Sequence, residues 1–209
     1  MNIIIFGATG SVGSLVVKRA LKDGHKVTAF ARNPDKLDIE NPNLTLRAGD
    51  ALNAAEVENA VKGHDAVVVT LGSGMSRKSI IRSQGTRNII AGMKKHGVER
   101  LICQSTLGAH ESWANLNFFW KRIMFGALLR PVFLDHEKQE NLVRESGLNW
   151  TLVRPSAFTD EDVSGVLKEG FGPGERKLSL KISRAEVAEF LNRQVSDADY
   201  LHRAVGVSH

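Results

Sequence analysis

Apolar runs rich in β-branched residues alternate along this chain with longer segments of helical periodicity. This alternation restricts the fold more than any other feature, because it is typical of a parallel sheet with helices on both faces. Several runs are apolar throughout, as expected for strands that are covered on both sides. The predicted strands are Asn2–Phe6, Lys26–Ala31, Leu44–Ala48, Ala66–Leu71, Arg100–Gln104 and Trp150–Arg154, with a short seventh strand around Lys177–Lys181 left open.

Helix boundary signals fit this alternation. Asn53 with Glu56, and Ser183 with Glu186, have the spacing of a capping box. Four glycines each follow a helical segment and precede a run, where a left-handed residue is wanted: Gly24, Gly63, Gly97 and Gly147. The pattern predicts α/β architecture with a doubly wound parallel sheet, and its cleft is expected at the carboxyl ends of the first and fourth strands.

Composition narrows the class of protein. The 209 residues are 42% hydrophobic and 24% charged, which suits one domain over residues 1–209. The net charge of +5 is spread without a basic run or aromatic stripe, so no nucleic-acid partner is expected. The single cysteine, Cys103, predicts no disulfide and no metal site, and with no targeting leader before Ile3 it suggests a cytoplasmic protein.

The most membrane-like stretch is Trp113–Leu134. It is interrupted by Lys121, Arg122 and Arg130, which leaves apolar segments far shorter than the ~20 residues of a membrane span. We therefore predict an amphipathic helix here and no membrane partner.

A glycine-rich turn directly follows the first apolar run. The chain reads Gly7-Ala8-Thr9-Gly10-Ser11-Val12-Gly13 and continues as the helical segment Ser14–Lys22. Gly7 permits a tight turn, Gly10 lets backbone amides approach a diphosphate, and Gly13 lets the helix pack closely on the strand. The helix N-terminus then faces the phosphates. The context predicts a Rossmann-type dinucleotide site, and an ordinary glycine-rich turn is the alternative.

The end of the second run favours one nicotinamide nucleotide. An NAD site usually carries an acid there, about 20 residues after the glycines. This chain has Arg32, whose planar guanidinium matches a 2′-phosphate, so NADP(H) is the expected cofactor. A solvated Arg32 paired with Asp35 is the alternative. Asp50, after the third run, could accept from the adenine amino group or simply start a helix.

The tyrosine content limits the chemistry. The best-known short-chain dehydrogenases use a Tyr, with a Lys four residues later, as the acid that protonates a developing alkoxide. The single tyrosine here, Tyr200, lies near the C-terminus without such a lysine. Ordinary ketone reduction is therefore not expected.

Several stretches extend the pattern beyond the glycine turn: Ile5–Gly10, Gly49–Asp50, Asp65–Val67 through Leu71–Gly72, Gly85–Ile89 and Arg144–Leu148. Together they resemble the atypical short-chain dehydrogenase/reductase branch that contains NADPH-dependent flavin reductase, also called biliverdin reductase B, over nearly the whole chain. The resemblance implies cofactor contacts, beside Gly13 of the glycine turn, from Gly7, Thr9, Gly10, Ser11, Val12, Arg32, Asp50, Ala51, Leu71, Gly72, Arg82, Cys103, His136, Pro155, Ser156 and Phe158.

Ser105 and His136 are the candidate catalytic residues. By the resemblance, Ser105 matches the family's active-site serine and would donate to the substrate or to the nicotinamide amide, with a capped strand end as the alternative. His136 matches a histidine beside the cofactor, at the start of the helix expected over the nicotinamide. A titrating imidazole there would orient the cofactor or assist proton delivery near neutral pH, and a solvated histidine is the alternative. Lys138 is a weaker candidate.

Departures from the family pattern leave the substrate open. Ala157 replaces a second histidine, and Arg154-Pro155-Ser156 replaces a more apolar stretch. The aromatic segment Trp113–Trp120 could stack a planar ligand or pack as core, and core packing is slightly favoured. The glycine-rich stretch Glu169–Arg176 is expected to be a loop beside the ligand site.

These features predict an NADPH-dependent oxidoreductase that transfers hydride to a planar conjugated acceptor, a flavin or a linear tetrapyrrole. Such an acceptor delocalises the incoming charge, so a proton can arrive later and the missing tyrosine is tolerated. A non-catalytic NADP(H)-sensing regulatory protein is the main alternative. An epimerase or dehydratase with bound NADP is less favoured, because it needs the acid. A monomer is expected, with a weak dimer as the alternative.

Overall fold

A computed structural model describes residues 1–74, 76, 80–161 and 163–209. The elements follow one another as β1 (Asn2–Phe6), α1 (Gly13–Lys22), β2 (Lys26–Ala31), η1 (Pro34–Leu37), β3 (Leu44–Ala48), α2 (Ala54–Val61), β4 (Ala66–Val69), α3 (Ile81–His96), β5 (Arg100–Gln104), η2 (His110–Asn115), η3 (Phe119–Leu128), α4 (Arg130–Arg144), β6 (Asn149–Pro155), β7 (Ala157–Thr159), β8 (Lys168–Glu169), β9 (Lys181–Ser183), α5 (Arg184–Arg193) and β10 (Arg203–Ser208).

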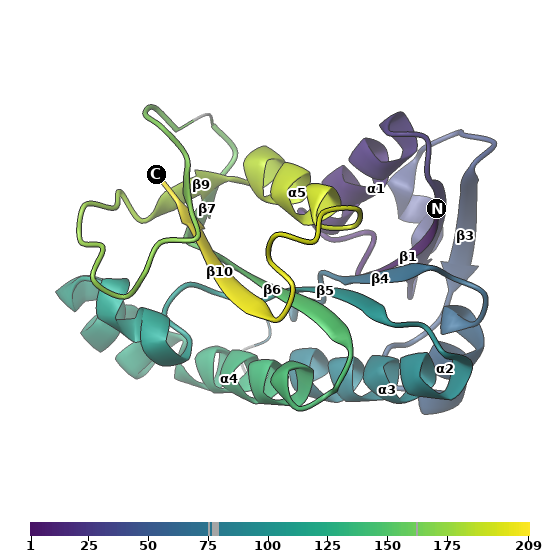
Figure 1. Cartoon of the computed structure of the whole chain (residues 1–209), viewed down its shortest axis with the longest axis horizontal. Coiled ribbons are helices and arrows are strands. Elements are labelled where there is room, and N and C mark those ends of the chain that lie inside the picture. Colours follow the sequence, from purple (N-terminus) through teal and green to yellow (C-terminus); the bar gives the residue numbers. More distant parts are fainter. Residues whose placement is uncertain (75, 77–79, 162) are drawn as a thin grey trace.

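The central sheet has eight strands in the order β3-β2-β1-β4-β5-β6-β10-β8. Its strands pair in parallel except for β8, which runs antiparallel to β10. Helices α1 and α5 lie over one face, and α2, α3 and α4 lie over the other (Figure 1). The predicted doubly wound Rossmann-like fold is confirmed. The strand order reverses between β1 and β4, which is where such sheets bind ligands.

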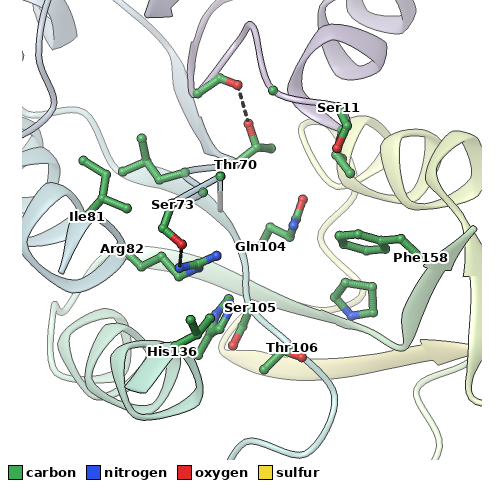
Figure 2. A pocket seen from close by; sticks show the side chains of 18 of the residues that line it. Ser11, Thr70, Ser73, Ile81, Arg82, Gln104, Ser105, Thr106, His136 and Phe158 are labelled. Carbon is green, nitrogen blue, oxygen red and sulfur yellow. Dashed lines mark hydrogen bonds between the residues drawn. The ribbon is translucent and has the colours of Figure 1, made fainter. Parts of the chain in front are cut away.

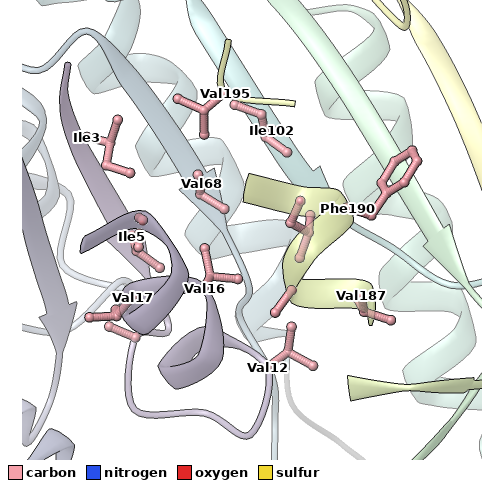
Figure 3. Close-up of a cluster of buried hydrophobic side chains, with 14 of the residues drawn as sticks. Ile3, Ile5, Val12, Val16, Val17, Val68, Ile102, Val187, Phe190 and Val195 are labelled. Carbon is pink, nitrogen blue, oxygen red and sulfur yellow. The ribbon is translucent and has the colours of Figure 1, made fainter. Parts of the chain in front are cut away.

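Burial on both faces explains the uninterrupted apolar runs. In β1, Ile3 and Ile5 pack into the core beneath α1 and α5, shown in Figure 3. Ile4 and Phe6, on the opposite face, pack into the core beneath α2, α3 and α4. Successive side chains thus alternate between the two cores, so neither face of the strand tolerates polar residues.

Most predicted boundaries are confirmed. Ser183 forms a complete capping box with Glu186, and Asn53 caps α2 by accepting from two backbone amides. The four helix-ending glycines all have positive φ, between 67° and 81°. The strand predictions differ from the structure in two ways. The proposed strand at Lys177–Lys181 is wrong, since β9 begins only at Lys181, and β7, β8 and β10 were not predicted.

The stretch Trp113–Leu134 is more irregular than a single amphipathic helix. It contains the end of the 3₁₀ helix η2, the π-helix η3 and the first turn of α4. The wider π turn is sealed by a hydrogen bond from the Leu129 amide to the Met124 carbonyl, five residues earlier. Among the described residues, no helix is both long enough and apolar enough to cross a membrane.

Candidate functional site

A pocket of about 740 Å³ opens at the carboxyl ends of the central strands. Figure 2 shows Phe158 across this pocket from Arg82 and His136, with Gln104 between them. The predicted site residues that line it are Gly7, Thr9, Gly10, Ser11, Val12, Arg32, Asp50, Ala51, Leu71, Gly72, Arg82, Ser105, His136, Pro155, Ser156 and Phe158. The fold therefore brings together residues that lie far apart in the sequence.

The glycine turn has the geometry that its sequence predicts. Gly7 has φ of +83°, which side chains rarely adopt, and a Cβ there would lie 2.6 Å from the Thr70 carbonyl oxygen. A Cβ on Gly13 would lie 2.2 Å from the Gly7 carbonyl oxygen and 2.7 Å from the Thr70 hydroxyl oxygen. Gly13 does not line the pocket itself. Its role is to let α1 start directly against the turn.

The start of α1 is suited to an anion. Within the described part of the chain, the amides of Ser11, Val12 and Gly13 donate to no backbone or side-chain acceptor. The helix carries no acidic residue in its first turn and no side-chain cap. Free N–H groups and the positive end of the helix dipole therefore face the pocket, as a diphosphate requires.

Arg32 and Asp50 lie at the adenosine end of this site. Arg32 is exposed, and among the described residues it forms no ion pair with Asp35 or any other acid. Its guanidinium therefore has no competing partner for a 2′-phosphate. The Asp50 Oδ1 atom accepts from the Leu52 amide at 2.9 Å, while Asn53 caps α2. Asp50 thus shapes the turn before the helix and is not its capping residue.

Cys103 does not line the pocket, in contrast to the expected cofactor contact. It is fully buried in β5 on the face covered by α2, α3 and α4. Burial, and then the nearby Glu140 charge, raises the pKa of the thiol well above its usual value. Alternation along the strand explains the difference, because its neighbour Gln104 reaches the pocket instead.

Ser105 is held by a buried carboxylate. Its hydroxyl donates to the Glu140 Oε1 atom at 2.7 Å, and both residues are almost fully buried. The expected donation from Ser105 to a ligand is therefore not available in this arrangement. Its oxygen can still accept a hydrogen bond from a ligand N–H group.

Glu140 is in turn clamped by Arg154. The Arg154 Nε and Nη2 atoms donate to the two carboxylate oxygens at 2.8 and 2.6 Å. Arg154 is 2% exposed and also binds Glu111, near the surface, at 2.7 Å. Burial alone would raise the pKa of Glu111, but the hydrogen bonds from Arg154, a backbone hydrogen bond and the charges of Arg154 and Arg144 together outweigh it and lower the pKa to about 2. The linked ion pairs of Glu111, Arg154 and Glu140 therefore fix the position of Ser105.

His136 is the seventh residue of α4 and lies in its second turn rather than at a helix start, since α4 begins at Arg130. It is 8% exposed, so the solvated alternative is wrong. Burial, followed by the charge of Arg82, holds the pKa of His136 well below its usual value. The imidazole is therefore neutral near neutral pH and holds no transferable extra proton there. Lys138 is exposed and does not line the pocket.

Arg82 is a half-buried cation that lines the pocket. Its Nη1 atom donates to the Ser73 hydroxyl at 3.2 Å. The Asp135 carboxylate accepts from the Arg82 amide at 3.1 Å and from the Ser83 hydroxyl, and so caps α3 from α4. This cross-helix cap fixes the position of Arg82 at the pocket wall.

Four buried polar atoms on pocket residues have no hydrogen-bond partner among the described residues: Arg82 Nε, Gln104 Oε1, His136 Nδ1 and Ser156 Oγ. Buried polar groups are normally paired, so such a cluster is typical of a ligand site. With the free amides of α1 and the space left by the glycines, these atoms fit a nicotinamide dinucleotide.

An apolar wall completes the pocket. It consists of Leu107, Leu116, Trp120, Phe125, Leu129, Val132 and Leu180. Of these residues only Leu116 and Trp120 belong to the segment Trp113–Trp120, for which stacking of a planar ligand was one prediction. This aromatic segment has two faces. Trp113 packs against the core cluster around Phe125, whereas Phe118 and Phe119 are 73% and 49% exposed, so core packing is wrong for these two.

The loop 169–176 does not line the pocket, although its Gly172 carbonyl accepts a hydrogen bond from the Asn115 side chain.

Known proteins show similarity over most of the chain. The Saccharomyces cerevisiae UPF0659 protein YMR090W is 27% identical over 202 residues, covering 91% of this chain and 85% of that protein. The chloroplastic divinyl chlorophyllide a 8-vinyl-reductase of Arabidopsis thaliana is 25% identical over 231 residues, 99% of this chain and 53% of that protein. The structure of ChuY, an anaerobilin reductase of Escherichia coli O157:H7, is 21% identical with a TM-score of 0.78, covering 99% of this chain and 96% of that one.

The last of these likenesses shows the shared fold. A family model described as NAD(P)H-binding matches residues 7–198, which include the glycine turn and nearly every residue that lines the pocket. On this match, the chain belongs to the NAD(P)H-binding family.

Proposed function

We propose that this chain is an NADPH-dependent reductase that transfers hydride to a planar conjugated acceptor of the flavin or linear tetrapyrrole type. The observation that carries the proposal is a pocket that joins the phosphate-binding turn to an apolar wall of Trp120, Phe125 and Leu129. Its size, about 740 Å³, suits a ligand pair of which one partner is flat and apolar. The nucleotide supplies the hydride when it is bound.

The state of the polar groups favours an acceptor that needs no strong acid. The Ser105 hydroxyl donates its hydrogen bond to Glu140, and His136 is neutral near neutral pH. Tyr200 packs against Phe190, away from the pocket. What these residues can supply is orientation, through hydrogen bonds and an apolar stacking surface. A delocalised acceptor accepts a proton from solvent afterwards.

Two likenesses support the acceptor class. The sequence resembles the branch that contains flavin reductase, and the relative from Arabidopsis thaliana is named as a reductase of divinyl chlorophyllide a, a tetrapyrrole. A non-catalytic NADP(H) sensor would share the nucleotide-binding turn, but would have no need of an apolar wall beside it.

Turnover is the direct test. We expect steady NADPH oxidation with FMN or biliverdin as acceptor. The loss of NADPH absorbance measures this oxidation. Ser105→Ala is expected to lower kcat about tenfold, which corresponds to about 1.4 kcal/mol, with little change in NADPH affinity. Ser196→Ala, at an exposed serine outside the pocket, is the control. Tight NADPH binding without turnover of any flavin or tetrapyrrole would instead support the sensor.

The cofactor preference has its own test. Arg32→Ala should weaken NADPH binding by about 10- to 100-fold, because one charge-assisted contact to the 2′-phosphate contributes ~1.5–3 kcal/mol. NADH binding should hardly change. Calorimetric titration with both nucleotides measures this difference, and Arg87→Ala, at an exposed arginine of α3, is the matched control. Equal NADPH affinity in wild type and Arg32→Ala would refute the assignment.

A further inference from the structure

The π-helix η3 has two different faces. Trp120, Phe125 and Leu129 point to the pocket. On the outer side, Phe118, Phe119, Ile123, Leu128 and, in α4, Leu134 are between 41% and 73% exposed. Spacings of four and five residues separate Phe119, Ile123 and Leu128, which suits the wider turn of a π-helix. We call this outer set, with the exposed Arg122 and Arg130, the η3 face.

The η3 face is both apolar and basic. The sequence from Ser112 to Leu134 contains Lys121, Arg122 and Arg130 and no acidic residue. The flanking acids do not neutralise these cations, because Glu111 binds Arg154 and Asp135 caps α3. Within the described chain, Arg122 and Arg130 form no ion pair. In Figure 1 this teal helical segment lies beyond the start of α4, at the end of the molecule away from α2 and α3.

We propose that the η3 face docks on an anionic lipid surface. Exposed aromatic and aliphatic side chains beside cations are the pattern of helices that lie in the membrane interface, where rings enter the headgroup region and cations bind acidic lipids. The cations that break the run exclude a membrane span but favour this surface orientation. The expectation of no membrane partner rested on those cations. For the η3 face we replace it with binding at the membrane surface.

A second copy of the chain is a poorer occupant. A twofold interface would place the η3 face against itself, since such interfaces use the same patch on both subunits. Arg122 and Arg130 would then meet further arginines, with no acid on the patch to pair with them. Anionic lipid supplies the missing negative charge and the apolar layer together.

The test uses vesicles and needs neither nucleotide nor turnover, so its outcome is separate from that of the reductase proposal. We expect the protein to co-sediment with vesicles of equal parts phosphatidylcholine and phosphatidylglycerol, and about tenfold more weakly with phosphatidylcholine alone. Binding should fall as salt is raised, because the cations act through a screened field. Emission from Trp120, beside the face, should shift to the blue on binding.

Two pairs of variants separate the contributions. Phe118→Ser with Phe119→Ser should weaken vesicle binding at least about tenfold, whereas Leu46→Ser with Val166→Ser, exposed apolar residues elsewhere, should not. Arg122→Gln with Arg130→Gln should weaken binding and flatten its salt dependence, in contrast to Lys22→Gln with Lys94→Gln, which removes the same charge from two other helices. Unchanged thermal unfolding confirms that each variant is folded.

Three results would overturn the proposal. The first is no co-sedimentation with acidic vesicles. The second is binding that survives both sets of changes to the η3 face. The third is a concentration-dependent dimer in sedimentation equilibrium that is lost in Phe118→Ser with Phe119→Ser, without vesicle binding, which would assign the face to a second copy.

Discussion

Replacing Glu140 with alanine is expected to lower the free energy of unfolding by about 3–5 kcal/mol. Arg154 is 2% exposed, and without Glu140 its guanidinium would keep only Glu111, near the surface, as a charged partner. The Ser105 hydroxyl would also lose its acceptor. For a chain of this length, such a loss lowers Tm by roughly 6–20 °C, which thermal and urea unfolding measure directly.

Two further variants make this prediction specific. Glu189→Ala, which removes an exposed ion pair with Arg19, should cost no more than about 1 kcal/mol. Glu140→Leu combined with Arg154→Met should recover most of the stability, because two apolar residues leave no buried charge unpaired. If Glu140→Ala destabilises the protein no more than Glu189→Ala does, the clamp does not stabilise the fold as argued.

Gly13→Ala is expected to weaken the binding of NADPH and NADH alike by at least about 100-fold, or ~2.7 kcal/mol. The new Cβ would lie 2.2 Å from the Gly7 carbonyl oxygen, so either the turn or the start of α1 must shift. Both carry the amides that face the diphosphate, which the two nucleotides share. Calorimetry or NAD(P)H fluorescence measures the loss.

Gly174→Ala is the matched control, because its Cβ would enter open space. Far-ultraviolet circular dichroism at the titration temperature shows whether the Gly13 variant is folded.

Comparing Arg32→Ala with Gly13→Ala also separates the 2′-phosphate end of the site from the diphosphate-binding turn. Arg32→Ala should discriminate between the nucleotides, and Gly13→Ala should not. Unchanged affinity in folded Gly13→Ala would show that the close packing of α1 on β1 is not needed for binding.

The parts of this protein that the sequence predicts are those determined by local chemistry. The glycine turn could be located because each glycine answers a steric demand of its own neighbourhood, as Gly7 and Gly13 do. The strand β1 could be located because its residues 3–6 are buried on both faces of the sheet and are all apolar. Arg32 follows from its position at the end of β2.

The polar network behind Ser105 could not be predicted in this way. The buried face of α4 includes Phe133, His136, Glu140 and Val143, at helical spacing, but two of these four are polar. A search for apolar periodicity therefore misses the face that packs on the sheet. Only the tertiary structure brings Glu140 against Arg154, a residue that appeared in the sequence merely as a departure from a family pattern.

The strand β10 was missed for a related reason. Its six residues include Gly206, and a glycine inside a run weakens a strand pattern. Glycine is required at this position because Phe171 packs where a Cβ would otherwise lie. An amphipathic helix was predicted over the stretch that contains η3, but its π geometry was not, because the exposed Phe119, Ile123 and Leu128 are separated by four and five positions, whereas a search for α-helix looks for three and four.

The late position of β10 in the chain has a consequence for biosynthesis. Residues Arg203–Ser208 pair with β6, and Val205 and Val207 fill the core between them and α5. A nascent chain that has completed β6 but not β10 exposes a parallel edge and an unfilled apolar surface to solvent or to other chains. While the ribosome adds the missing strand, the chain is therefore open to aggregation through this edge.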